Sequence, residues 1–176
     1  MEEAAKRRPE IQLSGLEWGI PGWVARSGMW SSANVDYLTG WAAGLRDKKG
    51  LNVTALAVAY NERAYDKGFI KSMRKSLDAA GLAHVKTIAP DSWGHMWSIV
   101  SEMQNDTDLA AAIDILGTHQ ECYGAQEQLP PNGTMALGKP LWSTELHIGE
   151  IGKVAACDTA AGESFDLPVW DIRAGM

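Results

Sequence analysis

The sequence predicts an α/β fold in which about five parallel strands alternate with helices, as part of a (β/α)8 barrel. Apolar strand-like runs alternate with segments whose apolar residues recur at helical spacing, which is typical of βαβ units. Polar residues follow several of these runs, as in barrels, where functional residues lie at the ends of many strands. No glycine-rich G-x-G-x-x-G or Walker-type loop is present, which argues against a doubly wound nucleotide-binding sheet.

Length and charge narrow the class of protein. At 176 residues, the chain is shorter than the ~250 residues typical of a closed barrel. The 16 basic and 22 acidic residues give a net charge of −6, without a long basic stripe, so we expect no nucleic-acid partner. No run approaches ~18 apolar residues, so we expect no transmembrane span. Residues 1–9 lack the apolar core of a secretory signal, so we expect no signal peptide.

The first predicted elements follow one another without long gaps. A short strand at residues 16–18 leads into a Gly- and Pro-containing loop at 19–23 that cannot continue a regular element. Apolar residues at steps of three and four predict a helix over 34–48, and Lys48-Lys49-Gly50 is a suitable carboxyl-terminal cap. The apolar run over 51–60 predicts the second strand.

The alternation continues through the middle of the chain. Asp66 is a suitable amino-terminal cap for a helix that ends near Gly81. A β-branched run predicts a strand at 85–89, helical spacing predicts a helix over 95–104, and a further strand is expected at 113–118.

The last third of the chain has fewer regular signals. Residues 120–140 read as a long loop with a possible helical turn, and 141–144 as the fifth strand. We therefore expect a polar N-terminal extension over 1–15, a partial barrel domain over 16–149 and a tail of uncertain structure over 150–176.

Two glutamates each follow a strand-like run. Glu62 follows the strand at 51–60, and Glu145 follows the strand at 141–144. Because the carboxyl ends of parallel strands share one edge of a sheet, both side chains are expected to converge there. A facing pair of carboxylates is what the cleavage of a glycosidic bond requires. Either glutamate alone could be a solvated boundary residue, but the pairing with Asn61 favours a functional site.

Three sequence blocks resemble the galactosylceramidases, glycoside hydrolase family 59, which are retaining glycosidases built on (β/α)8 barrels. The blocks are Trp18-Gly19-Ile20-Pro21-Gly22-Trp23, Asn61-Glu62-Arg63-Ala64-Tyr65-Asp66 and Gly138-Lys139-Pro140-Leu141-Trp142-Ser143-Thr144-Glu145. The likeness extends from about Leu16 to His147. It implies that the five strands correspond to strands 3 to 7 of the barrel, and that the chain is partial, a truncated gene model or a degenerate copy.

The resemblance also implies roles for individual residues. Glu62 would be the acid/base and Glu145 the nucleophile of a double displacement that retains the sugar configuration. Asn61 would donate a hydrogen bond to the hydroxyl beside the anomeric carbon. Trp18 and Trp142 would contact the substrate, with Trp18 as a stacking wall.

Two further residues allow more than one interpretation. His119 matches a histidine at the family's sixth strand end, which implies a substrate contact, but it could equally be a satisfied buried histidine. Asp91 could line the site or cap the following helix. The chain also departs from the family at Tyr60, where Trp is typical, and at Thr144, where Ser is typical.

The resemblance implies that the substrate is a β-galactoside of the galactosylceramide type, a glycosphingolipid. It also implies a saposin-type activator as a possible partner and a lysosomal or secretory location. Three glycosylation acceptors, at Asn52, Asn105 and Asn132, favour the same location.

No cofactor and no metal are expected, because the four histidines lack ligand spacing. Cys122 and Cys157 could be free thiols or one disulfide. Two alternatives remain open for the function of the chain. It could be an inactive sugar- or lipid-binding remnant, or a related barrel glycosidase with a different sugar preference.

Overall fold

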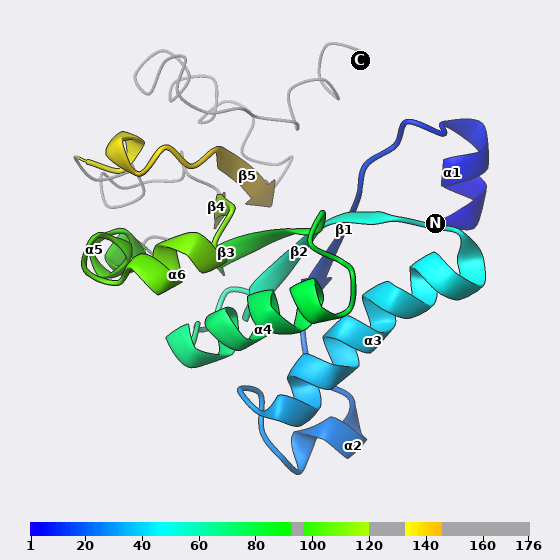
Figure 1. The fold of residues 1–176 in the computed structure, drawn as a ribbon, viewed down its shortest axis with the longest axis horizontal. Helices are drawn as coiled ribbons and strands as arrows, with labels where there is room; N and C mark the ends of the chain where they lie inside the picture. Colours follow the sequence, from blue (N-terminus) through cyan, green and yellow to red (C-terminus); the bar gives the residue numbers. More distant parts are fainter. Residues whose placement is uncertain (93–96, 120–132, 146–176) are drawn as a thin grey trace.

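The computed structural model describes residues 1–92, 97–119 and 133–145 (Figure 1). Its elements, in chain order, are α1 (Glu2–Arg7), β1 (Leu13–Glu17), α2 (Gly22–Ala25), α3 (Ser32–Lys49), β2 (Val53–Tyr60), α4 (Lys67–Ala79), β3 (Lys86–Ser92), α5 (Ser98–Asn105), α6 (Thr107–Ala112), β4 (Ile115–His119), the 3-10 helix η3 (Met135–Leu137) and β5 (Leu141–Glu145).

The five strands form one sheet in which every neighbouring pair is parallel. Their order in space, β1-β2-β3-β4-β5, is the same as their order in the sequence. A doubly wound sheet reverses its strand order at a switch point, whereas successive strands of a (β/α)8 barrel stay side by side. The predicted parallel α/β fold is therefore confirmed, and the strand order is that of a barrel segment. In the described part of the chain, β1 and β5 are the two edges of this sheet.

The main helices pack in a row, and they bury the larger core against one face of the sheet (Figure 1). α3 contacts α4, α4 contacts α6, and both α3 and α4 contact β2. In β2, Leu56 and Val58 belong to this larger core, whereas Ala55 and Ala57 belong to a second, smaller cluster. Successive strand residues point to opposite faces of a sheet, so the smaller cluster marks the face that would line the barrel interior. Trp142 packs against this smaller cluster.

Several predicted helix signals are confirmed at the level of atoms. The Asp66 side chain accepts a hydrogen bond of 2.7 Å from the backbone N–H of Phe69, which caps α4. Gly50 has the left-handed conformation with φ 63° and ends α3, where it satisfies the last carbonyl groups of the helix. Both signals are local in sequence, so they could be recognised without knowledge of the tertiary structure.

The amino-terminal part differs from the expectation. β1 begins at Leu13, three residues before the expected domain boundary at residue 16, and ends at Glu17, so that Trp18 follows the strand. The segment expected to be a polar extension contains the short helix α1. α2 begins at Gly22, inside the predicted loop at 19–23, and Pro21 is its N-cap residue. A proline tolerates the start of a helix, where backbone N–H groups have no partner within the helix.

The middle of the chain contains a helix that was not predicted. Asp106 accepts a hydrogen bond of 2.9 Å from the backbone N–H of Leu109 and so caps α6. The helix is only six residues long, so its apolar residues complete too few turns for periodicity to reveal it. As a result, β4 begins at Ile115 rather than at residue 113. α5 begins at Ser98 in the described chain, since residues 93–96 lie outside it.

Other expectations fall outside the described residues. They concern most of the loop at 120–140, the tail at 150–176, both cysteines, Asn132 and His147. The described part of the loop contains η3. None of the described helices is long and apolar enough to cross a membrane.

Glu17 is a carboxylic acid buried between β1 and the start of α3. It is only 4% exposed, and Asn34 donates a hydrogen bond of 3.1 Å from Nδ2 to Oε2 of Glu17. Oε1 of Glu17 has no hydrogen-bond partner among the described residues. Burial raises the pKa of Glu17, and the hydrogen bond from Asn34 offsets this effect only in part.

The first prediction concerns Gly117, which lies in β4 between β3 and β5. A Cβ atom there would lie 2.5 Å from Cγ2 of Ile88 and 3.1 Å from Cγ2 of Thr144. We expect Gly117→Ala to lower the free energy of unfolding by about 1–3 kcal/mol, because this part of the sheet would be overpacked. Gly40→Ala is the matched control, since a Cβ atom on this exposed face of α3 meets nothing described within 4 Å. The control should stabilise the helix by about 0.5–1 kcal/mol. Urea unfolding of both variants tests this, and equal effects would contradict it.

The second prediction concerns the pH dependence of stability. Because the pKa of Glu17 is raised in the folded state, its contribution to stability is full in acid and is lost as pH rises through the folded-state pKa. Glu17→Gln keeps an acceptor for Asn34 but does not titrate. We therefore expect the free energy of unfolding of this variant to increase relative to that of the wild type as pH is raised from acid to neutral. Urea unfolding at a series of pH values measures this difference. The control is Glu10→Gln, whose parent side chain is 67% exposed. Parallel pH profiles for Glu17→Gln and the wild type would disprove the assignment.

Candidate active site

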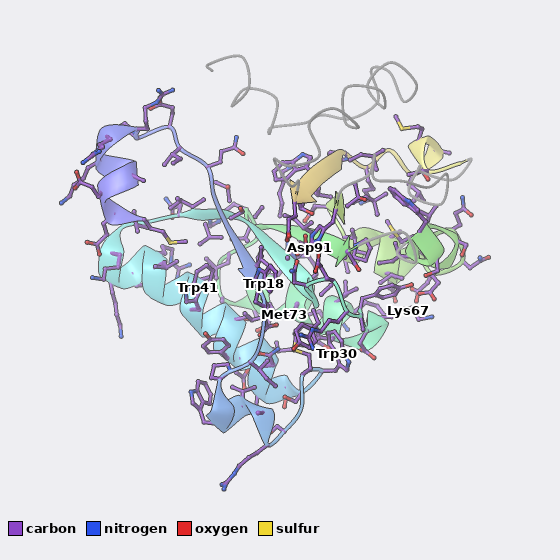
Figure 2. The ribbon with its side chains drawn as sticks, turned by 180° about the vertical axis from the view of Figure 1, so that it is seen from behind. Trp18, Trp30, Trp41, Lys67, Met73 and Asp91 are labelled. Atoms are coloured by element: carbon purple, nitrogen blue, oxygen red, sulfur yellow. The ribbon has the colours of Figure 1, made fainter. Side chains whose placement is uncertain are left out.

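Titratable side chains from four neighbouring strands meet at the carboxyl-terminal edge of the sheet. Glu62 lies two residues after β2, Asp91 lies near the end of β3, and His119 and Glu145 are the last residues of β4 and β5. His119 is aligned with Glu145 in the pairing of β4 with β5. Figure 2 shows Asp91 near β5. The parallel sheet thus brings together residues that are far apart in the sequence.

His119 is at the centre of this group. Its Nε2 atom lies 3.0 Å from Oδ1 of Asp91, and its Nδ1 atom lies 3.2 Å from Oε1 of Glu62. The same Nδ1 atom lies 3.7 Å from Oε2 of Glu145. One carboxylate oxygen of each glutamate and one ring nitrogen of His119 all lie within 4.8 Å of one another. The two glutamates therefore face each other across a short gap.

The four side chains differ in their access to solvent. His119 is fully buried and Asp91 is 1% exposed. The side chains of Glu62 and Glu145 are 27% and 22% exposed. A ligand that approaches from solvent would therefore meet the two glutamates, with the Asp91–His119 pair beneath them.

The backbone around the site is held in an uncommon conformation. Glu62 has φ 58° and Asp91 has φ 56°, in the left-handed region that residues other than glycine rarely adopt. The N–H of Glu62 donates to the carbonyl oxygen of Asp91 at 3.2 Å, and the N–H of Asn61 donates to the carbonyl oxygen of Glu17 at 3.1 Å. Neighbouring strands thus fix the turn after β2. Backbone of this kind is concentrated at functional sites.

The charge on His119 is governed by its carboxylate neighbours. Burial alone lowers the pKa of His119, but the hydrogen bond and negative charge of Asp91, together with Glu62 and Glu145, outweigh burial and raise the pKa. The site therefore favours an imidazolium cation among three carboxyl groups.

The structure also places the other residues expected at the site. Asn61 is 2% exposed, and neither polar atom of its side chain has a hydrogen-bond partner among the described residues. Trp142 lies on the inner face of the sheet, against the small cluster that includes Ile88. Trp18 is 61% exposed and, with Trp41, lines a cavity of about 340 Å³ beside β1. The roles expected for these residues remain predictions.

Asp91 does not cap α5, the first helix that the structure describes after it, and residues 93–96 lie outside the described residues. The N-cap residue of α5 is Trp97, and no side chain makes the capping hydrogen bond there. Asp91 pairs with His119 instead. Sequence reasoning did not find this pair, although both residues lie at the ends of adjacent strands, which is the signal that could have revealed it.

The geometry would also allow a cation between Glu62, His119 and Glu145, since each offers one ligand atom. His119 would coordinate a cation through Nδ1 only without a proton on that atom. Two facing carboxylates can carry out acid–base and nucleophilic chemistry without a metal.

Comparison with known proteins identifies relatives of the chain. It is 34% identical over 151 residues to the galactocerebrosidase of Homo sapiens and 35% identical over 150 residues to that of Mus musculus. Each alignment covers 82% of this chain and 21% of the relative, so the chain spans about a fifth of the length of these curated relatives. The glucuronoxylanase XynC of Bacillus subtilis is 31% identical over 109 residues, which cover 56% of this chain and 24% of that protein.

Solved structures support the barrel fold. The structure of the family 30 subfamily 8 xylanase Xyn30A of Clostridium acetobutylicum aligns with 94% of this chain, and the alignment covers 49% of the xylanase chain. The TM-score is 0.67 and the sequence identity is 20%. The structure of SrfJ of Salmonella typhimurium aligns with 81% of this chain, and the alignment covers 37% of the SrfJ chain. The TM-score is 0.66 and the sequence identity is 18%. The sequence model of glycosyl hydrolase family 59 matches residues 1–163. The chain therefore belongs to glycosyl hydrolase family 59.

Proposed function

We propose that the chain carries the catalytic pair of a retaining glycoside hydrolase that cleaves the β-galactosyl bond of galactosylceramide-type glycosphingolipids. The observation that carries this proposal is the separation of Glu62 and Glu145, which have carboxylate oxygens within 4.8 Å of each other. Retaining enzymes hold their two carboxyl groups about 5–5.5 Å apart, whereas inverting enzymes leave about 6.5–9.5 Å for a water molecule. The short gap supports a double displacement.

In the first step, a carboxylate oxygen of Glu145 attacks the anomeric carbon and forms a covalent ester with the sugar. The bond from that carbon to the leaving oxygen breaks as Glu62 transfers its proton to this oxygen. In the second step, Glu62 removes a proton from water, and the water oxygen attacks the same carbon. The ester bond breaks, Glu145 is released as a carboxylate, and two inversions give net retention.

Asn61 is proposed to bind the sugar hydroxyl beside the anomeric carbon. Its amide is buried without a described partner, and an unpaired buried polar group costs about 1–3 kcal/mol. A hydrogen bond to the substrate would remove this cost. Trp18 and Trp142 are proposed as apolar walls, because the face of an indole ring can stack on the C–H face of a sugar.

The names of the relatives support the galactosyl specificity. A second candidate specificity comes from XynC, a glucuronoxylanase that is 31% identical over 109 residues. Two carboxylates at the anomeric carbon do not by themselves select the sugar. The third candidate, a sugar-binding remnant without turnover, is motivated by the two edge strands β1 and β5 in the described sheet.

The family resemblance further motivates a lysosomal or secretory location and delivery of lipid by a saposin-type activator. Asn52 and Asn105, two of the three glycosylation acceptors, are exposed at the ends of β2 and α5. An acceptor must be reachable at the surface, and both of these meet that condition.

The third prediction separates the roles of the two glutamates. With a β-galactoside that has a poor leaving group, Glu62→Gln should lower kcat/KM by about 10²–10⁴-fold, because the leaving oxygen is no longer protonated. With a dinitrophenyl β-galactoside the loss should be much smaller, since this leaving group needs little protonation. Glu145→Gln should abolish turnover of both substrates, because no covalent intermediate can form. Glu10→Gln should leave the rates unchanged. Full activity in either active-site variant would refute the assignment.

The fourth prediction concerns the choice between the candidate functions. We expect this chain to hydrolyse an aryl β-galactoside at least about tenfold faster than the corresponding β-xyloside, by analogy with the modest discrimination that pocket contacts provide. A preference for the xyloside would favour the second specificity. If the chain binds galactosides but shows no hydrolysis that depends on Glu62 and Glu145, the sugar-binding remnant would be favoured.

A further inference from the structure

Asp91 and His119 form a buried pair to which the double displacement, as proposed above, assigns no role. They are 1% and 0% exposed, so neither is accessible from solvent in the way that the glutamates are. Their hydrogen bond of 3.0 Å nevertheless places His119 directly against the reacting groups, since its other ring nitrogen lies 3.2 Å from Glu62. Any role of Asp91 in the reaction must therefore act through His119.

The two nitrogens of His119 restrict where protons can lie. A neutral imidazole has one N–H and one lone pair, and only the imidazolium ion has two N–H groups. Both nitrogens of His119 face carboxyl oxygens. A lone pair that faced an ionised carboxylate would be repelled, so the doubly protonated ring satisfies all of these contacts without taking a proton from Glu62. In the proposed reaction, Glu62 needs that proton for the leaving oxygen.

The surrounding charges favour the same protonation state. Among the described residues, the titratable groups that face the ring are Asp91 from β3, Glu62 after β2 and Glu145 at the end of β5. Oδ2 of Asp91 is buried and has no described hydrogen-bond partner. A buried carboxylate in this position depends on a nearby cation, and the ring of His119 is in position to supply it.

We propose that Asp91 is a positioning residue that acts through His119. It keeps the ring doubly protonated, and the resulting cation holds Glu62 and Glu145 at the separation the reaction requires. The inference rests on the proposed function, because it gives a role in that reaction to groups beneath the catalytic pair. The Nδ1–H group can donate to Oε1 of Glu62 whether that carboxyl is protonated or ionised. The cation also reduces the repulsion between the two glutamates when both are ionised.

The first test measures the charge on His119 and needs no turnover. Ring titrations of the whole chain are followed by nitrogen-15 NMR, with the exposed His84 as an internal reference. We expect His119 to stay doubly protonated to higher pH in the wild type than in Asp91→Asn. Asp114→Asn is the matched control, because Asp114 accepts from the backbone N–H of Thr87 on β3 and has no described contact with His119. An unchanged titration of His119 in Asp91→Asn would overturn the proposal.

The second test measures the consequence for the reaction. In Asp91→Asn, kcat should fall at least about tenfold at neutral pH, with little change in KM, and the basic limb of the pH–rate profile should move to lower pH. The glutamine of His119→Gln cannot carry a positive charge. This variant should therefore lose the contribution of His119 to the basic limb of the pH–rate profile. If Asp91→Asn does not fold, the pH–rate profile of His119→Gln decides whether the charge on His119 contributes to the basic limb. A uniform loss of rate with an unshifted limb would show a purely structural role and overturn the proposal. A wild-type chain without turnover would contradict the proposed function, while the NMR titration would still decide the charge on His119.

Discussion

The site depends on the parallel direction of β2, β3, β4 and β5. The connections place the helices together on one face and return every strand to the same edge of the sheet. The end of each strand can then contribute one side chain to a common point, which is how Glu62 and Glu145 meet although 83 positions separate them, 145 − 62. An antiparallel sheet would place the ends of alternate strands at opposite edges and would not assemble this group.

Close approach of several carboxyl groups creates an electrostatic problem that the buried ring of His119 can solve. Asp91 is only 1% exposed, so water screens its interaction with the ring less than it would at the surface. The glutamates are partly exposed and can change protonation state during a reaction. The burial of each group thus suits the proposed chemistry, because the Asp91–His119 pair is buried and the two glutamates are partly exposed.

The sequence revealed those features that depend on local patterns. The Asp66 cap, the Gly50 terminus and the alternation of strands with helices are encoded within a few residues of each other, and the structure contains all of them. The early start of β1 was not predicted, because it depends on pairing with β2, and the short helix α6 was missed because six residues are too few to show a periodicity. The Asp91–His119 pair was missed for a similar reason. Its members are 28 residues apart and are joined only by the register of β3 with β4.

The described structure also separates the groups proposed to react from those proposed to contact the substrate. Glu62, Asp91, His119 and Glu145 support one another through contacts within β2 to β5. β1 adds to this support mainly through the carbonyl oxygen of Glu17, which accepts from the N–H of Asn61. Trp18, in contrast, is 61% exposed beside the edge strand β1, where no further described strand positions it. The proposed chemical step would therefore rely on groups that lie at the ends of paired strands. A contact between Trp18 and a substrate, as proposed above, would in contrast depend on the loop that follows an edge strand of the described sheet.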